Sequence, residues 1–203
     1  MTIAPLHVVR DGGAVDLDAA AAAVQDLLVA LGQEPDSDHL AETPRRVATA
    51  LAELLTPRPF TMTSFANDGG YDEMVVVRDI EFHSLCAHHM LPFLGVAHVA
   101  YVPGHRVVGL SKLARLVEHC SRGLQTQERL TTEVADALDE HLLPRGVGVV
   151  MEATHLCMSI RGVRASGATT VTAAVRGEVR EDPSTRAEFT RLTSARPRGV
   201  APG

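Results

Sequence analysis

Apolar residues recur at helical spacing in the first quarter of the chain. From position 20 to 31 they fit one amphipathic helix, which begins after the acidic Asp16 and ends at Gly32. The apolar positions of this helix are Ala20, Val24, Leu27, Leu28 and Leu31. A second helix is predicted to start with Thr43 as its N-cap and Pro44 as its first residue, where a missing N–H does no harm. Its buried stripe would consist of Val47, Leu51, Leu54 and Leu55. Both helices precede every chemically distinctive segment, which indicates a packing or assembly role.

A period of two replaces the helical period after Met74. Polar and buried positions alternate from 74 to 84, as in a strand with one face in the core. A second strand is predicted over 96–102, and residues 86–93 form a loop in which ligands can converge. The inward positions of the first strand are Ile80, Phe82 and Ser84, and the outward ones are Asp79, Glu81 and His83. The later predicted elements are helices over about 111–122 and 125–142 and strands over 147–153 and 169–176. The second of these helices has one apolar face, formed by Leu130, Val134, Leu138 and Leu142.

Helices and strands are segregated along the chain. Two helices, a strand pair, two further helices and two strands follow one another, which favours an α+β fold with an antiparallel sheet. A four-stranded sheet has two open edges, and a folded protein must cover or pair them. Pairing between identical subunits into a larger barrel is one solution, so we expect a homo-oligomer. Residues 1 to about 15 show no periodicity and are expected to form a loose lead-in. After Leu192 the composition turns to Ser, Ala, Arg, Pro and Gly, which predicts a mobile tail.

Composition and charge narrow the class of protein. The 203 residues are 45% hydrophobic and 22% charged, which is typical of a soluble globular protein. A net charge of −6 gives no support to nucleic-acid binding. Three cysteines, an odd number, argue against a disulfide framework and for a reducing compartment. The N-terminus has no signal-peptide pattern, and no apolar run is long enough to span a bilayer. We therefore expect a cytoplasmic protein that binds neither nucleic acid nor membrane.

Two short segments contain the residues best suited to bind a metal. They are Cys86-Ala87-His88-His89 and His155-Leu156-Cys157. A Cys-x-x-His pair can bind one zinc ion from a single turn, and Cys157 would complete a Cys-His-Cys set. Three protein ligands leave the fourth tetrahedral position for water, which indicates a catalytic zinc and a hydrolytic reaction. Buried cysteines are often inert small hydrophobic residues, and this is our interpretation of the isolated Cys120.

Several motifs in a fixed order resemble GTP cyclohydrolase I, the zinc enzyme that opens the guanine imidazole ring and rebuilds a pterin. The resemblance covers about residues 41–192. The matching segments are 42–46, 86–89, 109–115, 125–131, 152–158 and 161–163. The resemblance implies a tunnelling fold, in which an antiparallel sheet with a helical layer assembles into an oligomeric β-barrel. It also implies a ring-shaped homo-oligomer, expected to be a decamer, with sites at subunit interfaces. The implied domains are an N-terminal helical region (1–60), a catalytic domain (61–193) and a flexible tail (194–203).

The resemblance also implies a reaction, in which GTP is hydrolysed at C8 by a zinc-bound water and rearranged to 7,8-dihydroneopterin triphosphate and formate. This chain would then be a hydrolase acting on a cyclic amidine C–N bond. The implied zinc ligands are Cys86, His89 and Cys157. His155 would protonate N7, since histidine exchanges protons near neutral pH. His88 would act at the ribose ring oxygen, orient the water, or only hydrogen-bond to the zinc ligands.

The remaining implied residues bind the substrate or assist its rearrangement. Glu128 would accept hydrogen bonds from the N1–H and amino group of guanine, and Gln127 would contact the carbonyl edge. Ser111 would assist the ribose rearrangement, although a helix cap explains this serine equally well. Arginine and lysine side chains suit the triphosphate, and some of them could come from a second subunit. These are Lys112, Arg115, Arg161 and Arg46.

The chain departs from the family pattern at three places. Ala87 replaces the usual glutamate, Gly123 replaces a common arginine, and Ala168-Thr169 replaces a more usual Ser-Lys pair. These departures keep three alternatives open. One is a divergent paralogue that stops at a ring-opened formamide, another is a non-catalytic zinc-containing purine- or pterin-binding module, and the third is another tunnelling-fold enzyme. The pathway that uses the product, whether folate, deazapurine or specialised metabolite, is left open as well.

Overall fold

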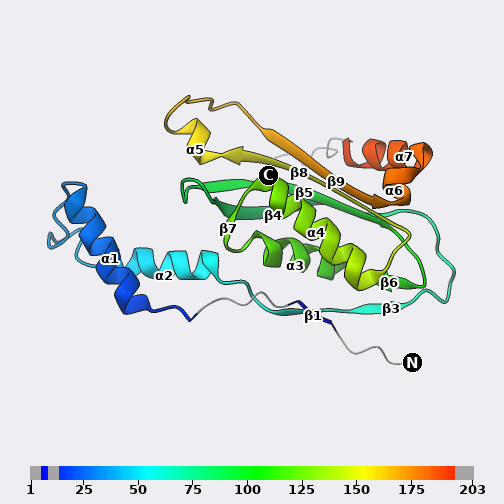
Figure 1. Ribbon diagram of the computed structural model, residues 1–203, viewed down its shortest axis with the longest axis horizontal. Helices are drawn as coiled ribbons and strands as arrows, with labels where there is room; N and C mark the ends of the chain where they lie inside the picture. Colours follow the sequence, from blue (N-terminus) through cyan, green and yellow to red (C-terminus); the bar gives the residue numbers. More distant parts are fainter. Residues whose placement is uncertain (1–5, 9–13, 195–203) are drawn as a thin grey trace, which may run out of the picture.

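The computed structural model describes residues 6–8 and 14–194 (Figure 1). The tail predicted after Leu192 lies outside the described residues apart from Thr193 and Ser194, which are helical and not loose, and most of the predicted lead-in is outside them as well. Within that lead-in, the structure contains one strand, β1 (Leu6–Val8), which pairs with β2 (Phe60–Met62). The expectation that this segment lacks regular structure is therefore wrong for residues 6–8.

The two predicted N-terminal helices are present as α1 (Leu17–Ala30) and α2 (Thr43–Leu55), which pack against each other beyond one end of the sheet (Figure 1). The Asp16 side chain accepts hydrogen bonds from two backbone N–H groups and so caps α1. In α2 the N-cap is Glu42 and Thr43 is the first helical residue, so the predicted cap was one residue late. The predicted stripe of α2 is half-buried, and no residue of α1 is buried.

A five-stranded sheet forms the centre of the molecule, with the strand order β7-β4-β5-β8-β9. Its strands are β4 (Val75–Cys86), β5 (Pro92–Val102), β7 (Leu124–Gln125), β8 (Gly146–His155) and β9 (Thr170–Gly177). Neighbours are antiparallel except β4 and β7, which pair in parallel over two residues. The expected four strands are thus present, and the short β7 adds a fifth that the pattern did not predict. A small separate sheet pairs β3 (Ser64–Ala66) with β6 (Arg106–Val108).

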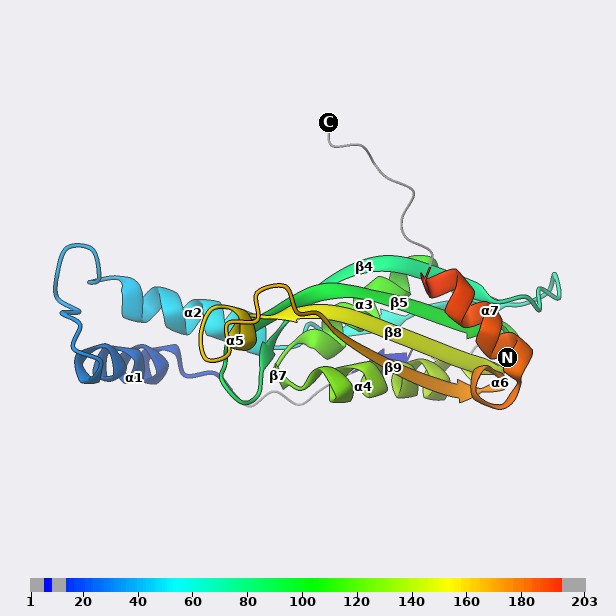
Figure 2. The same ribbon diagram turned by 90° about the horizontal axis from the view of Figure 1, so that it is seen from above.

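Two helices, α3 (Leu110–Ser121) and α4 (Gln127–Leu142), cover one face of this curved sheet (Figure 2). The alternation predicted for β4 is confirmed, since its three inward positions are buried and its three outward positions are exposed. The predicted apolar face of α4 is also buried. Burying each large apolar side chain in this layer contributes about 1.5–3 kcal/mol. The largest buried apolar side chains are Tyr101, Phe93, Leu113, Leu116, Leu130, Leu138 and Met151.

The starts of these two helices differ from the prediction. Gly109 is the N-cap of α3, and Ser111 lies within the first turn, so the proposal that Ser111 caps this helix is wrong. Thr126 caps α4 by accepting a hydrogen bond from the Arg129 N–H. The expected start at 125 was too early, because Leu124 and Gln125 pair with β4 instead.

One helix follows β8 and two follow β9. They are α5 (Leu156–Ser159), α6 (Glu178–Glu181) and α7 (Pro183–Ser194), and none was predicted. α7 packs through Phe189 on the sheet face opposite α3 and α4 (Figure 2). Among the described helices, none is both long enough and apolar enough to cross a bilayer. The mixed helix-and-strand class is confirmed, with the helices mainly on one face of a predominantly antiparallel sheet.

Candidate metal centre

A tight turn at the end of β4 presents Cys86, His88 and His89. The Cys86 carbonyl accepts hydrogen bonds from the N–H groups of His89 (3.3 Å) and Met90 (2.8 Å), which closes the turn. Met90 has a left-handed backbone (φ 55°), and this conformation reverses the chain into β5. The Ala87 N–H donates to the Gln125 carbonyl at 2.9 Å, so β7 holds the turn from outside. The loop between the two strands is shorter than predicted, since β5 already begins at Pro92.

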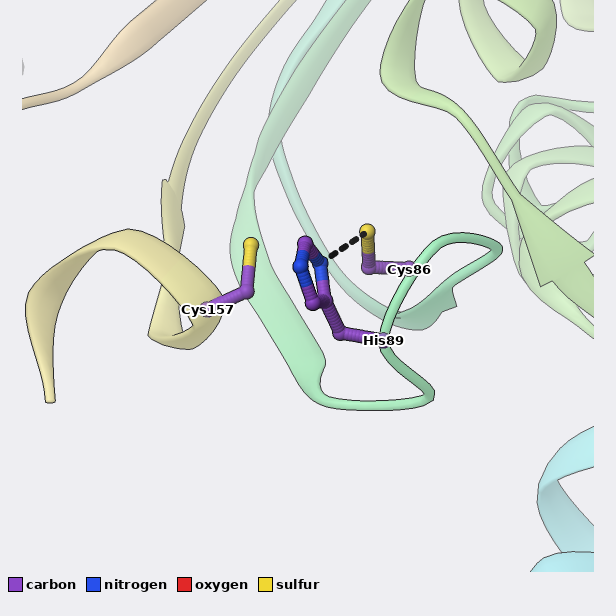
Figure 3. Close-up of side chains that lie close together, drawn as sticks. All are labelled: Cys86, His89 and Cys157. Atoms are coloured by element: carbon purple, nitrogen blue, oxygen red, sulfur yellow. Dashed lines mark hydrogen bonds between the residues drawn. The ribbon is translucent and has the colours of Figure 1, made fainter. Parts of the chain in front are cut away.

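Cys157 reaches the same place from the other half of the chain. Pairing of β5 with β8 sets Phe93 opposite His155, and α5 begins directly after His155. Figure 3 shows Cys157 on α5 facing Cys86 and His89. One donor atom from each of these three residues lies within 4.8 Å of the others, and Cys86 Sγ lies 4.0 Å from His89 Nδ1. Two ligands of a tetrahedral zinc lie roughly 3.5–3.8 Å apart, so small side-chain shifts would let this set hold a metal ion.

The electrostatics of the two thiols agree with this geometry. Burial raises the pKa of the Cys157 thiol, and the neighbouring Cys86 sulfur raises that pKa further. Two adjacent thiolates repel each other in the absence of a cation. A divalent cation reverses this balance, because coordination deprotonates a thiol outright. The pair therefore suits a metal better than it suits two free thiolates.

His155 is held beside these sulfur atoms by two contacts. Its ring stacks on Phe93 with a centroid distance of 4.6 Å and an interplanar angle of 2°. Its Nε2 atom lies 2.8 Å from Gln127 Oε1. Burial lowers the pKa of His155, and the negative charge of Glu128 partly opposes that effect. Both the position and the protonation of this ring are therefore set by its neighbours.

A cavity of about 290 Å³ brings most of the predicted site residues together. Of the predicted residues, it is lined by Cys86, His88, His89, Gln127, Glu128, His155 and Cys157. The structure adds four further residues to its walls, namely Gln125, Thr126, Met158 and Thr170. The first three of these lie inside matched sequence segments, which could have indicated them. Thr170 comes from β9, and nothing in the local sequence signals its position.

The predicted phosphate-binding residues lie elsewhere. Neither Ser111 nor Lys112 lines this cavity. Both lie in the first turn of α3. The last residue of this helix, Ser121, accepts a hydrogen bond from Ser84 of β4, close to the turn at Cys86. Ten residues of helix separate Ser111 from Ser121, which is about 15 Å along the axis. Arg115, Arg161 and Arg46 are exposed and also lie outside the walls of the cavity. Arg161 is nevertheless near enough to Cys157 for its positive charge to lower the pKa of that thiol, against the larger effect of burial. Within one chain, none of these four cationic side chains lines the cavity of the candidate metal ligands.

Several known proteins that are similar to this chain carry the name of one enzyme. The family model for GTP cyclohydrolase I matches residues 20–194. The protein named GTP cyclohydrolase 1 from Thermobifida fusca is 56% identical to this chain over 82% of this chain and 83% of its own length. The protein of the same name from Streptomyces avermitilis is 53% identical over 91% of this chain and 94% of its own length. The relative from Deinococcus radiodurans is 52% identical over 81% of this chain and 78% of its own length.

Among solved structures, the apo form of the archaeosine synthase QueF-Like aligns with a TM-score of 0.43 and 17% identity, covering 51% of this chain and 93% of that one. This TM-score is too low to assign a common fold. The family model, in contrast, spans both segments of the candidate metal site and nearly all described elements. The chain belongs to the GTP cyclohydrolase I family.

Proposed function

We propose that this protein is a zinc-dependent GTP cyclohydrolase I, which converts GTP and water to formate and 7,8-dihydroneopterin triphosphate. The observation that carries this proposal is the convergence of Cys86, His89 and Cys157 in one cavity with His155 and Glu128. Relatives at 52–56% identity carry the name GTP cyclohydrolase 1, which supports the same reaction. The proposed domains remain residues 1–60, 61–193 and 194–203, and the cytoplasmic location remains a prediction.

Zinc is the metal that this donor set favours. Two thiolates and one imidazole select zinc over magnesium or calcium, which prefer oxygen ligands. Cys86, His89 and Cys157 would hold the ion and leave a fourth position open. When bound, zinc supplies the Lewis acidity that makes water nucleophilic at neutral pH.

Two side chains in the cavity are suited to recognise and protonate guanine. Glu128 lies in the first turn of α4 and is exposed toward solvent. Its carboxylate only accepts hydrogen bonds, which matches the N1–H and amino donors of guanine and rejects adenine, which has no N1–H. His155 would deliver the proton that N7 needs when the imidazole ring opens. His88, in the same wall, would act at the ribose or orient the metal ligands.

The triphosphate is proposed to be bound by a second copy of the chain. Lys112, Arg115, Arg161 and Arg46 lie outside the walls of the cavity of their own chain, although their chemistry suits phosphate oxygens. Assembly into the ring-shaped tunnelling fold would bring such groups from one subunit to the metal centre of another. Exposed apolar side chains on α1 and around α5 support an interface there; they are Leu27, Val29, Leu31, Met158, Ile160 and Val163. The number of subunits, expected to be ten, remains a prediction.

The test of this function is product analysis with zinc-loaded protein and GTP. Equal amounts of formate and dihydroneopterin triphosphate would establish the complete reaction and make Ala87 a tolerated change. A ring-opened formamide without free formate would instead identify the divergent paralogue. Intact GTP that is bound beside a stoichiometric zinc would favour the non-catalytic binding module, while a different pterin or deazapurine product would indicate another tunnelling-fold enzyme.

A further inference from the structure

The side chain of Gln127 is completely enclosed at the base of the cavity. It is 1% exposed and is the first residue of α4. Its amide nitrogen lies 3.1 Å from the Met151 carbonyl oxygen and 2.9 Å from the Thr170 carbonyl oxygen. The same nitrogen lies 3.1 Å from Thr172 Oγ1. Both hydrogens of the amide are therefore used to join α4 to β8 and β9.

These contacts determine which way the amide points. A backbone carbonyl oxygen can only accept a hydrogen bond, so the atom facing Met151 and Thr170 must be the amide nitrogen. The amide oxygen consequently faces His155 Nε2, at 2.8 Å. A reversed amide would place its oxygen against two carbonyl oxygens and leave both of these carbonyls without their donor.

The neighbouring hydroxyl groups agree with this orientation. Thr131 Oγ1 donates its single hydrogen to the backbone carbonyl oxygen of Gln127 at 2.7 Å. In its 2.6 Å contact with Thr172 Oγ1, Thr131 must therefore be the acceptor. Thr172 thus donates to Thr131 and is free to accept from the Gln127 amide. The two amide hydrogens are then shared among three acceptors, and both hydroxyl groups agree with an amide nitrogen on this side.

The orientation of Gln127 fixes the tautomer of His155. Because the amide oxygen only accepts, His155 Nε2 must carry a hydrogen. In the neutral ring the lone pair is then on Nδ1, the only ring nitrogen left to exchange a proton. Stacking on Phe93 fixes the plane of the ring, and Gln127 fixes its rotation within that plane.

We infer that Gln127 is a positioning residue that holds His155 with Nδ1 available to the substrate, and that Gln127 is not a guanine contact. This inference rests on the proposed function for the identity of the substrate. It replaces the expectation that Gln127 contacts the carbonyl edge of guanine, because a carbonyl oxygen needs a donor and both amide hydrogens of Gln127 are engaged within the protein. Glu128 is then the residue of this pair whose side chain is exposed and can contact the base.

Steady-state kinetics distinguish the two roles of Gln127. We expect Gln127→Met, which removes the acceptor at similar size, to lower kcat for formate release by about 100-fold, since positioned acid–base groups contribute 10²–10⁴-fold. KM for GTP and the zinc content should stay within about twofold of the native values. A guanine contact would instead raise KM with little change in kcat, and that result would overturn the inference.

Two matched variants separate positioning from folding. Gln127→Glu keeps an acceptor for His155 but loses the donors to β8 and β9, so its kcat should exceed that of Gln127→Met by about tenfold. Thr172→Val removes one partner of the amide nitrogen without touching His155, and its kcat should remain within about threefold of native. If Gln127→Glu is no better than Gln127→Met, the role is only structural and the inference fails.

A spectroscopic measurement tests the inference without any turnover. In ring-15N-histidine-labelled, zinc-loaded native protein at about pH 8, where the imidazole is neutral, His155 should show a protonated Nε2 and an unprotonated Nδ1. The His155 signals are identified by their loss in His155→Asn. The opposite tautomer would overturn the inference. If native protein releases no formate from GTP, the proposed function fails, while this spectrum still decides the contact between Gln127 and His155.

Discussion

At the scale of single residues, the proposed metal centre depends most on Cys157, because it is the one ligand of the proposed set that comes from the second half of the chain. We expect Cys157→Ala to lose the bound zinc and to reduce formate release to background, since two remaining ligands leave the ion weakly held. Metal analysis by mass spectrometry, together with the formate assay, checks this outcome.

Cys120→Ala is the matched control for that variant. Cys120 is equally small and is buried in α3 outside the walls of the metal cavity, so its replacement should leave zinc binding intact. A Cys157→Ala protein that retained one zinc per chain would disprove the proposed ligand set.

Residue types with distinctive chemistry were the ones that could be assigned before the structure. Cysteine and histidine at metal-ligand spacing limit the possibilities strongly, and the family resemblance selected among them. Gln127 could be placed in a motif, but its contacts could not be inferred. They depend on which carbonyl groups of β8 and β9 face α4, and strand register is a property of the folded sheet.

The departure at Gly123 has a local explanation at the same scale. Its backbone has φ 102°, a left-handed conformation that glycine adopts without steric penalty. Its N–H donates to the Leu54 carbonyl at 3.1 Å, which joins the end of α2 to the segment before β7. Nothing in the structure explains the Ala168-Thr169 pair.

At the scale of elements, a bulge in β4 is held by a histidine of the neighbouring strand. The pairing of β4 with β5 shifts between Val77 and Ile80, and Asp79 there has a left-handed backbone (φ 58°). The Asp79 N–H donates to His98 Nδ1 at 3.1 Å. Protonation of His98 would remove this acceptor, so the bulge requires a neutral imidazole.

Stability should consequently decrease on mild acidification. Burial lowers the pKa of His98, and nearby Arg78 lowers it further, although Asp79 and Glu152 oppose the shift. Between this lowered pKa and the ordinary value of about 6.5, the unfolded chain binds more protons than the folded one. The free energy of unfolding is therefore highest above that window and falls as pH decreases through it. Burial lowers the pKa of His141 as well, which adds to the same trend.

Chemical denaturation across this pH range measures the effect. His98→Asn keeps an acceptor oxygen near the position of Nδ1 but does not titrate, so its stability should vary less with pH than that of the native protein. His83→Asn changes an exposed residue of β4 and should leave the native pH dependence unchanged. An unaltered slope in His98→Asn would contradict this explanation of the bulge.

The contact of α7 with the sheet depends on the absence of a side chain at Gly148. A methyl group there would lie 2.6–2.8 Å from ring atoms of Phe189. Gly148→Ala is expected to displace α7 and to destabilise the protein by about 1–3 kcal/mol, measured by denaturant unfolding. Gly167→Ala, where no atom lies within 4 Å of the added methyl group, should change stability by less than about 1 kcal/mol. Equal effects of both substitutions would refute a role for this close packing.

The long elements were predictable because their patterns are strong. The alternation in β4 and the apolar face of α4 follow directly from periods of two and 3.6 residues. The elements that were not predicted are either very short or lack a regular apolar pattern. β7 has two residues and exists only because α3 and α4 place it beside β4, and α7 has few apolar positions from which a helical stripe could be read.

At the scale of the whole molecule, the distribution of surfaces indicates self-assembly. No residue of α1 is buried. Its side chains Leu27 and Val29, and the C-cap residue Leu31, are each more than half exposed. In the described sheet, β4 and β9 have long outer edges, of which only the end of β4 is paired, by β7. Open edges and apolar helix faces of this kind are normally covered by another chain. The proposed assembly would also bring Lys112, which lies outside the walls of the cavity of its own chain, to the metal site of a neighbouring copy.

Subunit complementation tests this explanation directly. Lys112→Ala and Cys157→Ala should each be inactive alone, the first through loss of a phosphate contact and the second through loss of zinc. If one subunit supplies Cys157 and its neighbour supplies Lys112, co-assembly creates some interfaces at which both residues are native. Random mixing in equal amounts would restore about a quarter of the sites.

Formate release by co-expressed variants, compared with each variant alone, measures this recovery. A site contained within one chain could not recover, because every chain would lack one of the two residues, so the absence of activity in the mixture would argue that Lys112 acts within its own subunit or not at all.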